Sequence, residues 1–210
     1  MDIPGAWHLF VGELKSTGAL QWIAVLLGVA EVLLAKANKI LLYPAGILSS
    51  AISMYLLASV GLYAECGLNG YYVVMSIYGW WHWTRKKNAP PVKITYCTKK
   101  DWKIVVVMTI AGYVLLELAL DHLTPSTVPE LDALVTATAW VGTWLLAKRK
   151  IENWILLNIS NIVAIPLLWY KQLPLFSALT VFLFIVAVQG YFSWRKKIKD
   201  DSSSVVIAER

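Results

Sequence analysis

Seven long apolar segments, separated by short polar stretches, follow one another along most of the chain. A helix needs about 20 mostly apolar residues to cross the hydrocarbon core of a bilayer, and the segments approach that length. The predicted membrane spans are 18–35, 40–60, 68–83, 104–120, 133–147, 154–170 and 175–194. The pattern therefore predicts an all-α integral membrane protein with seven transmembrane helices.

Basic residues are concentrated in alternate loops between these segments. The loops after the first, third, fifth and seventh spans hold sixteen of the nineteen, whereas the three other loops hold Lys171 alone. The sixteen are Lys36, Lys39, Arg85, Lys86, Lys87, Lys93, Lys99, Lys100, Lys103, Lys148, Arg149, Lys150, Arg195, Lys196, Lys197 and Lys199. Because cytoplasmic loops carry the excess of Lys and Arg, the N-terminus should lie outside and the C-terminus in the cytoplasm. We expect an interfacial lead-in at 1–17 and a disordered cytoplasmic tail at 198–210.

The ends of the third and seventh spans resemble each other, which indicates an internal repeat. GWWHWTRKK at 79–87 matches GYFSWRKK at 190–197 with an offset of 111 residues. The same offset pairs Tyr43 with Trp154 and Ser50 with Asn161. We therefore predict two parallel three-helix repeats, 18–87 and 133–197, joined by a linker with the fourth helix at 88–132. The alternative is that Trp followed by Lys or Arg recurs at any cytoplasmic interface.

Composition narrows the functional classes. The chain is 58% hydrophobic and 15% charged, with a mean hydropathy of +0.60, which excludes a soluble domain. The net charge of +6 follows from the loops, so we expect no nucleic-acid partner. A phosphate-binding loop, a metal-ligand pattern and a catalytic serine or zinc motif are absent from the sequence, so we expect no cofactor, no metal and no catalytic residue. A transporter is favoured, and a membrane-embedded enzyme is the alternative from a different class.

The sixth span carries the richest set of polar residues within the hydrocarbon region. Trp154, Asn158 and Asn161 lie at i, i+4 and i+7, on one stripe of a helix. An aromatic plane with two amides suits a planar heterocycle that bears hydrogen-bonding groups. The alternative is that the two asparagines bond to neighbouring helices.

Other spans add candidate substrate contacts. Trp140 is the mid-span aromatic of the fifth span, Gln189 lies one turn from the inner end of the seventh, and Tyr78 lies at the end of the third. Ser50 is a candidate in the second span, although serine there also suits close helix packing.

Glu31 is the acidic residue placed well inside the inner half of a span. An intramembrane carboxylate marks a functional site by default, since it is costly to bury. It could attract a cationic substrate or relay a proton. Equally, it could bond to neighbouring helices or extend toward the inner interface.

Four strings resemble the Pnu-type vitamin transporters, whose best-known branch is the nicotinamide riboside transporter PnuC: YPAGILSS, GLYAE, YYVVMSIYGWWHW and IENWILLNISNIVAIPLLWYKQL. The resemblance extends from about residue 18 to 197. It implies a 3+1+3 helix plan related to the SWEET sugar transporters and a place in a bacterial inner membrane. It also implies facilitated diffusion of a vitamin, which a cytoplasmic kinase traps by phosphorylation.

The family branches take nicotinamide riboside, thiamine or riboflavin, and we rank nicotinamide riboside first and thiamine second. The family pattern WxxWxxxN matches Trp154 and Asn161, but Leu157 stands where the second Trp is expected. That departure leaves the identity of the vitamin open. Membrane lipids are further expected partners, and a homo-oligomer is a further expectation.

Overall fold

The apolar segments fold as helices, the secondary structure that satisfies every backbone polar group of a membrane-spanning segment internally. The structure, a computed structural model, describes residues 3–84, 92–123 and 128–208. The helices are α1 (Ile3–Ser16), α2 (Ala19–Lys36), α3 (Leu42–Ser59), α4 (Tyr63–Thr84), α5 (Lys99–Leu123), α6 (Pro129–Ala147), α7 (Asn153–Tyr170) and α8 (Pro174–Ala208). The seven predicted apolar segments coincide, in order, with α2 to α8.

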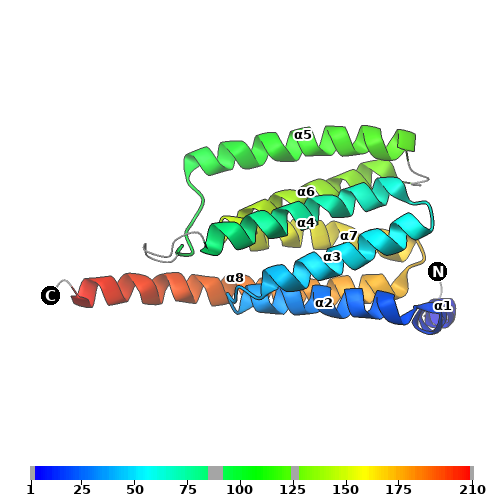
Figure 1. The fold of residues 1–210 in the computed structure, drawn as a ribbon, viewed down its shortest axis with the longest axis horizontal. Helices are drawn as coiled ribbons and strands as arrows, with labels where there is room; N and C mark the ends of the chain where they lie inside the picture. The colour runs from blue at the N-terminus through cyan, green and yellow to red at the C-terminus, as the bar shows by residue number, and fades with distance from the viewer. Residues whose placement is uncertain (1–2, 85–91, 124–127, 209–210) are drawn as a thin grey trace.

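Five of the described helices are long and apolar enough to cross a membrane: α2, α3, α5, α7 and α8. The helices α4 and α6 are of comparable length, 22 and 19 residues, and run alongside them in the bundle (Figure 1). α6 begins with Glu130 and Asp132 in its first turn, which lowers its hydropathy. The all-α membrane fold is therefore as expected from the hydropathy pattern.

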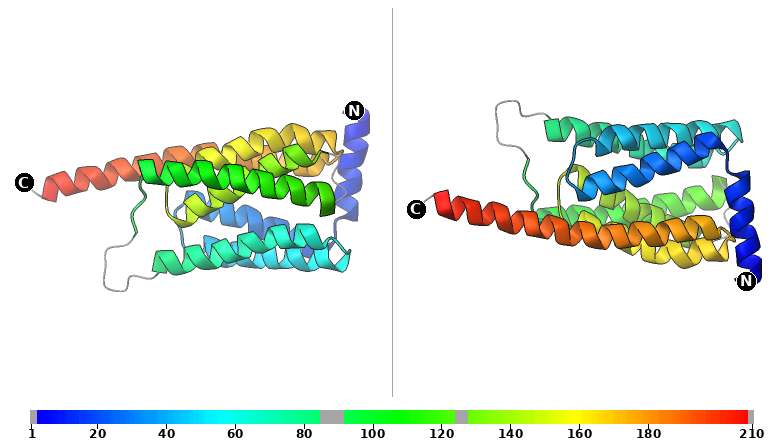
Figure 2. Two further views of the ribbon diagram at one scale, coloured as in Figure 1. Left: turned by 90° about the horizontal axis from the view of Figure 1, so that it is seen from above. Right: turned by 90° about the horizontal axis from the view of Figure 1, so that it is seen from below.

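The bundle consists of two groups of three helices. α3 packs between α2 and α4, and α7 packs between α6 and α8, while α4 meets α6 and α2 meets α8 between the groups. We call α2–α4 the first triplet and α6–α8 the second triplet. α5 packs on α6 at the outside of the bundle, and α1 lies crosswise at one end (Figures 1 and 2). The carboxylate of Glu13 on α1 accepts a hydrogen bond from the backbone N–H of Leu175, at 2.8 Å, and so joins α1 to the start of α8.

The two triplets share one spacing in the sequence. α3 and α7 begin and end 111 residues apart, as do the starts of α4 and α8 and the ends of α2 and α6. Residues with left-handed backbone follow the same spacing, since Asn38 (φ 59°) pairs with Arg149 (φ 53°) and Gly61 (φ 81°) pairs with Gln172 (φ 60°). A left-handed residue after the last turn is a common way to end a helix. The helix ends of the two triplets are therefore built alike.

Each triplet also packs one aromatic ring against a glycine and against the edge of a tryptophan. The sets are Tyr43, Gly79 and Trp83 in the first triplet, and Trp154, Gly190 and Trp194 in the second. Ring centroids lie 5.1 Å and 5.6 Å apart with planes at 88° and 87°. A Cβ on either glycine would lie 2.3 Å or 2.7 Å from the facing ring, so glycine is required for this approach.

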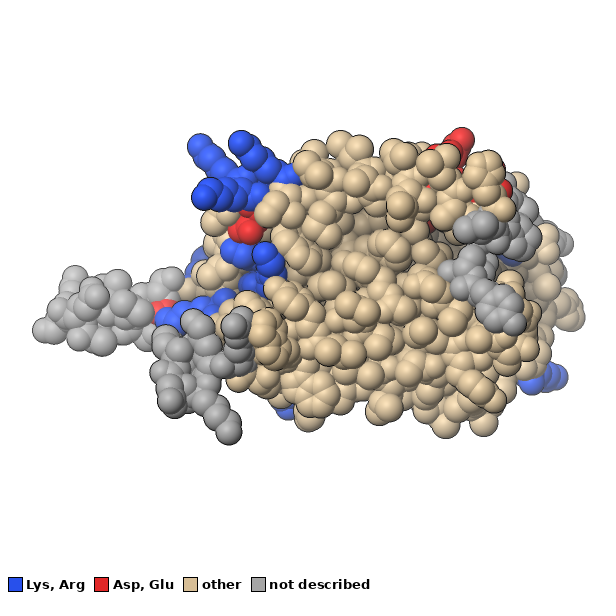
Figure 3. Space-filling model, turned by 45° about the horizontal axis from the view of Figure 1, so that its top comes forward, with Lys and Arg blue, Asp and Glu red and all other residues tan. Residues whose placement is uncertain are grey.

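Basic side chains gather at one end of the bundle. Figure 3 shows Lys and Arg toward the end from which α8 protrudes, and a surface without charged residues between the two ends. That end carries the turns between α2 and α3 and between α6 and α7. Arg85, Lys86 and Lys87 belong to the predicted basic loops but lie outside the described residues.

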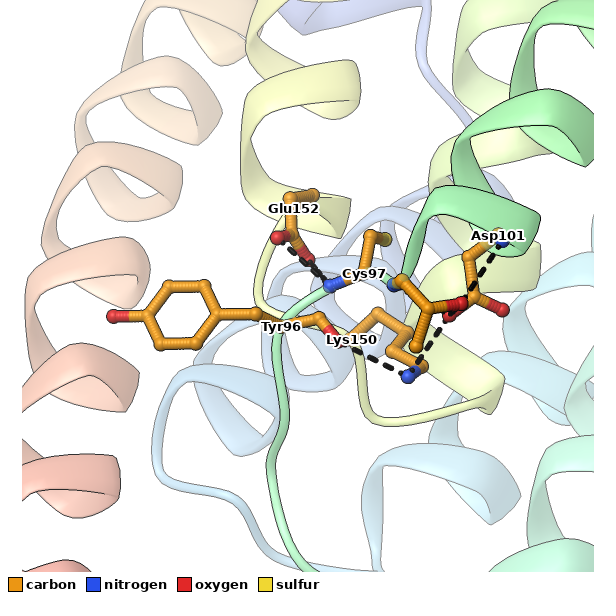
Figure 4. A network of polar contacts seen from close by, with 6 residues as sticks. Tyr96, Cys97, Asp101, Lys150 and Glu152 are labelled. Atoms are coloured by element: carbon orange, nitrogen blue, oxygen red, sulfur yellow. Dashed lines mark hydrogen bonds and ion pairs between the residues drawn. The ribbon is translucent and has the colours of Figure 1, made fainter.

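The described part of the linker before α5, residues 92–98, lies along the turn between α6 and α7 (Figure 4). Thr95 forms an isolated parallel bridge with Lys150, whose ammonium group pairs with Asp101 at 3.1 Å. Both carboxylate oxygens of the buried Glu152 accept from the backbone N–H of Cys97, at 2.9 Å each. Burial raises the pKa of the Cys97 thiol to about 12, and the hydrogen bond and negative charge of Glu152 add to the effect. The linker is thereby fixed to the second triplet.

The segment expected to be a disordered tail, 198–210, belongs to α8 as far as Ala208. α8 continues through the segment, with the hydroxyl of Ser203 donating to the carbonyl of Lys199 at 3.0 Å. After Trp194 no Gly or Pro interrupts the sequence, and Lys196 precedes Asp200 by four residues, a favourable helical spacing. Low hydropathy alone was not a reason to end the helix.

Candidate functional site

A cavity of about 740 Å³ lies between the two triplets. Its lining comes from α2, α3 and α4 on one side and from α6, α7 and α8 on the other, and no described residue of α5 contributes. Small-molecule sites are commonly clefts of about 300–1,000 Å³. The cavity therefore has the size and the position of a binding site between two helix groups.

The lining is mostly apolar, with a limited number of polar side chains. Among its described residues the one acidic side chain is that of Glu31, and no Lys or Arg lines the cavity. Hydroxyl and amide groups complete the polar part: Gln21, Ser49, Ser50, Ser53, Ser59, Asn69, Tyr72 and Thr143. A neutral or cationic ligand fits this lining, whereas an anionic ligand would meet an acidic side chain and, among the described lining residues, no Lys or Arg.

The carboxylate of Glu31 packs directly on the backbone of α3. A Cβ on Gly46 would lie 2.4 Å from Oε1 of Glu31, so the glycine makes room for the carboxylate. Within the described part of the chain no hydrogen bond or ion pair reaches this carboxylate, and the phenol groups of Tyr43 and Tyr72 lie within its electrostatic reach. A carboxylate held in place and unpaired is suited to receive a cation from the cavity.

Trp154 forms part of the deep wall. It is 1% exposed, and its edge-on contact with Trp194 and its position over Gly190 fix the ring. Its indole Nε1 is buried and has no hydrogen-bond partner among the described residues. Leu157 lines the same wall and packs on Gly142, where a Cβ would lie 3.0 Å from the leucine side chain. The wall thus combines an aromatic ring with an aliphatic group.

Ser49, Ser50 and Ser53 of α3 all line the cavity, and two of them also bond to the backbone. Ser49 donates to the carbonyl of Ala24 at 2.8 Å, and Ser53 donates to the carbonyl of Ser49 at 2.9 Å, so both are bonded to the backbone. Ser50 is 9% exposed and lines the cavity. Close packing accounts for Ser49 and Ser53, and Ser50 stays a candidate contact.

Of the eight residues proposed from the sequence, the structure brings three together at the cavity: Glu31, Ser50 and Trp154. The asparagines Asn158 and Asn161, on α7, are half-buried and lie outside the lining. The side-chain oxygen of Asn158 is buried without a partner among the described residues.

The remaining three residues make contacts elsewhere. Trp140 stacks on Tyr71 with centroids 4.4 Å apart and accepts the tyrosine hydroxyl at its backbone carbonyl, at 2.9 Å. Gln189 is exposed on α8 and accepts from the ammonium group of Lys36. Tyr78 stacks on the ring of His82 at 5.8 Å. None of the three lines the cavity in this conformation.

Seven polar lining residues were not among the sequence candidates: Gln21, Ser49, Ser53, Ser59, Asn69, Tyr72 and Thr143. Gln21 and Asn69 lie near span ends, where polar residues are ordinary and give little signal. The 111-residue offset places Tyr72 opposite Leu183, an apolar residue, so the repeat did not single it out either. The only sequence feature that could have indicated Gln21 and Asn69 is that their amide side chains lie within predicted membrane spans.

Comparisons with known proteins agree on one family. A family model described as nicotinamide mononucleotide transporter matches residues 18–196. A nicotinamide riboside transporter PnuC of Neisseria mucosa is 28% identical over 86% of this chain and 73% of its own length, and the one of Escherichia coli is 22% identical over 88% and 89%. The crystal structure of a vitamin B3 transporter PnuC is similar with a TM-score of 0.70 and 26% identity, covering 94% of this chain and 90% of that chain.

Proposed function

The chain belongs to the nicotinamide mononucleotide transporter family and is a multi-pass membrane transporter of a small vitamin rather than an enzyme, and from this membership we propose that it carries nicotinamide riboside. Transport proceeds by facilitated diffusion, with the cavity between the triplets facing the two sides of the membrane in turn. Glu31, Ser50 and Trp154 contact the substrate.

The single observation that carries this choice is the charge of the cavity. Glu31 is ionisable and unpaired, and no Lys or Arg lines the cavity among the described residues. Nicotinamide riboside has a positively charged pyridinium ring and no phosphate, so its ring is attracted to the carboxylate and to aromatic faces. The mononucleotide carries a phosphate, which normally requires Arg, Lys or backbone N–H donors. The lining therefore supports the riboside over the mononucleotide.

Thiamine is the second candidate because it is also a planar cation. The observation that favours it is Leu157, an aliphatic side chain one turn from Trp154 on the cavity wall, where a second aromatic ring would narrow the space. Riboflavin carries no positive ring, so the unpaired Glu31 gives it no support.

A seven-span arrangement of 3+1+3 helices supports the transport cycle. We propose that α2–α4 (within 18–87) and α6–α8 (within 133–197) are parallel repeats, and that α5 (within 88–132) is the connecting span. The equal 111-residue spacing of helix ends and left-handed residues supports this proposal. Such repeats, with the substrate between them, permit alternating access by rocking of one against the other. The crosswise α1 is the interfacial lead-in.

The orientation follows from the charges. We place the end with the basic turns and the protruding α8 in the cytoplasm of a bacterial inner membrane, and α1 at the outer face (Figure 3). A kinase in the cytoplasm would then trap the vitamin by phosphorylation, because the product carries a phosphate that the cavity does not accommodate.

Binding to the purified protein tests the substrate. A ligand stabilises the folded state by RT ln(1 + [L]/Kd), which is about 2.7 kcal/mol at about 100 Kd. Nicotinamide riboside should raise the melting temperature, and the mononucleotide at the same concentration should not. Stabilisation by the mononucleotide alone would overturn the proposal, and stabilisation by thiamine alone would select the second candidate.

Uptake into proteoliposomes tests the mechanism. Labelled riboside should equilibrate to equal concentrations on both sides, and a pH gradient should leave that endpoint unchanged. Encapsulated kinase with ATP should raise the total label well above equilibrium. Accumulation driven by the pH gradient without the kinase would show proton coupling and would assign it first to Glu31.

A further inference from the structure

The cavity is open toward one end of the bundle and closed toward the other. At the α1 end its lining reaches Val60, which is 69% exposed in the turn between α3 and α4. At the basic end its deepest lining residues, Ala35, Leu146 and Trp154, belong to a cluster of buried side chains that connects the two triplets. This conformation therefore presents the cavity to the α1 end, with the cluster as its floor.

Two hydrogen bonds cross between the triplets at this floor. The indole N–H of Trp83 on α4 donates to the carbonyl of Ala147 at the end of α6, at 3.0 Å. The indole N–H of Trp194 on α8 donates to the carbonyl of Ala35 at the end of α2, also at 3.0 Å. The two tryptophans are 111 residues apart, so equivalent residues of the two triplets donate the two bonds.

The positions of the two bonds follow from their donors and acceptors. A buried indole N–H needs an acceptor, and a carbonyl in the last turn of a helix is free to accept from another helix. The carbonyl of Ala35 also accepts from the backbone N–H of Asn38, at 2.9 Å, and uses its second lone pair for Trp194. Separation of the triplets at this end therefore leaves both indole N–H groups without these acceptors.

Further contacts between the triplets lie beside these bonds. The guanidinium of Arg149 lies 3.7 Å from the ring centroid of Trp83. On the other side, the ammonium of Lys197 donates to the carbonyl of Ala37 at 2.9 Å, and Lys36 donates to Gln189. These polar contacts are short-ranged and reversible, as required of groups that separate and meet again.

We propose that the reciprocal pair of indole bonds, Trp83 to Ala147 and Trp194 to Ala35, is the inner gate of the transporter. The two bonds close the basic end of the cavity while the α1 end is open, and both break when the cavity opens to the cytoplasm. The proposal rests on the proposed transport cycle, because a gate has a role only if the cavity opens alternately to the two sides.

Two pairs of spin labels measure the opening, with both native cysteines replaced by serine. One pair, at Thr84 and Lys148, reports the separation of α4 from α6. The other pair, at Lys39 and Arg195, reports the separation of α2 from α8. Pulsed electron resonance on the full chain in lipid nanodiscs, without substrate, gives the populations of short and long distances for each pair.

Trp83→Phe and Trp194→Phe each remove one indole N–H and keep an aromatic ring. Each substitution should raise the long-distance population roughly threefold, the effect of one weak hydrogen bond between membrane helices. The decisive expectation is that either substitution opens both label pairs, because one rigid-body movement breaks both bonds. Trp80→Phe, on a tryptophan of α4 that is 42% exposed, is the matched control and should change neither pair.

Three results would overturn the gate: unchanged distances in both variants, opening of the local label pair alone, or the same opening in the Trp80 control. If a phenylalanine variant does not fold, a short bifunctional maleimide across Thr84→Cys and Lys148→Cys replaces it, with Trp83 and Trp194 intact. This crosslink should stop uptake of nicotinamide riboside and leave its binding from the outside intact, and continued uptake would overturn the gate. Coupled opening in a protein that does not bind the riboside would instead refute the proposed substrate and keep the gate.

Discussion

Replacing Glu31 by Gln isolates the charge of the cavity, because the two side chains have nearly the same size. The carboxylate lines the cavity and has no ion-pair partner among the described residues. Its interaction with a bound pyridinium ring is therefore not already offset by a cation of the protein. The substitution should weaken the binding of nicotinamide riboside and leave the fold intact.

The magnitude follows from the distance and the surroundings. Two unit charges about 5 Å apart attract each other by about 3 kcal/mol at an effective dielectric constant of about 20, and by about 0.8 kcal/mol in bulk water. A cavity open at one end lies between these limits, so we expect a loss of about 1–2 kcal/mol. That loss corresponds to a roughly 5- to 30-fold rise in Kd, measured by isothermal titration calorimetry.

A neutral ligand of the same shape separates charge from hydrogen bonding. Reduced dihydronicotinamide riboside has the same ribose and amide but an uncharged ring, so Glu31→Gln should leave its Kd nearly unchanged. Glu117→Gln, on a half-buried carboxylate of α5 that is remote from the lining, is the matched control. An unchanged Kd for the charged riboside, or an equal loss for both ligands, would refute the electrostatic role of Glu31.

Four further outcomes are expected. Alkylation of Cys97 should be slow at pH 8 and rise about tenfold per pH unit toward the thiol pKa of about 12, because the thiolate is the nucleophile; maximal labelling at pH 8 would contradict this. Labelling in intact cells from the outside should reach Cys66 and spare Cys97, and the reverse would invert the orientation. Gly46→Ala should fold, since the Cβ displaces only the flexible end of Glu31, but should raise the riboside Kd several-fold, and an unchanged Kd would show that the carboxylate position is unimportant. Leu157→Trp should narrow the cavity and weaken thiamine more than the riboside in a competition assay, and equal effects would remove Leu157 from the choice of substrate.

The helices were largely predictable because hydropathy changes sharply at their ends. The first span was expected to end at residue 35, and α2 ends at Lys36, where a charge meets the interface. The third was expected from residue 68, but α4 begins at Tyr63, because polar residues in its first turns reduce the local hydropathy. At the other end of the chain, α8 continues beyond the apolar segment through charged residues, so hydropathy did not mark where this helix ends.

The candidate site was only partly predictable, because periodicity gives the face of a helix and not its neighbour. Trp154, Asn158 and Asn161 share a stripe of α7, yet the cavity is lined by Trp154 and Leu157. Which residues of that face line the cavity depends on how the two triplets pack against each other, and the sequence pattern of one helix does not contain that information. Glu31 was predicted because a carboxylate within a membrane span is unusual on any face of the helix.

The 111-residue relation shows how two helix triplets with the same spacing line a cavity with two different sides. Glu31 packs on Gly46 in the first triplet. The equivalent residues of the second triplet are Gly142 and Leu157, which also pack on each other. In the first triplet the long side chain lies on α2 and the glycine on α3, whereas in the second the glycine lies on α6 and the long side chain on α7. Each pair therefore fills a comparable space. This exchange places the charge on the α2–α3 side of the cavity and an aliphatic wall on the α6–α7 side. A cation bound between the triplets is therefore oriented, with its charged ring toward α2 and α3, although the two halves of the scaffold are built alike.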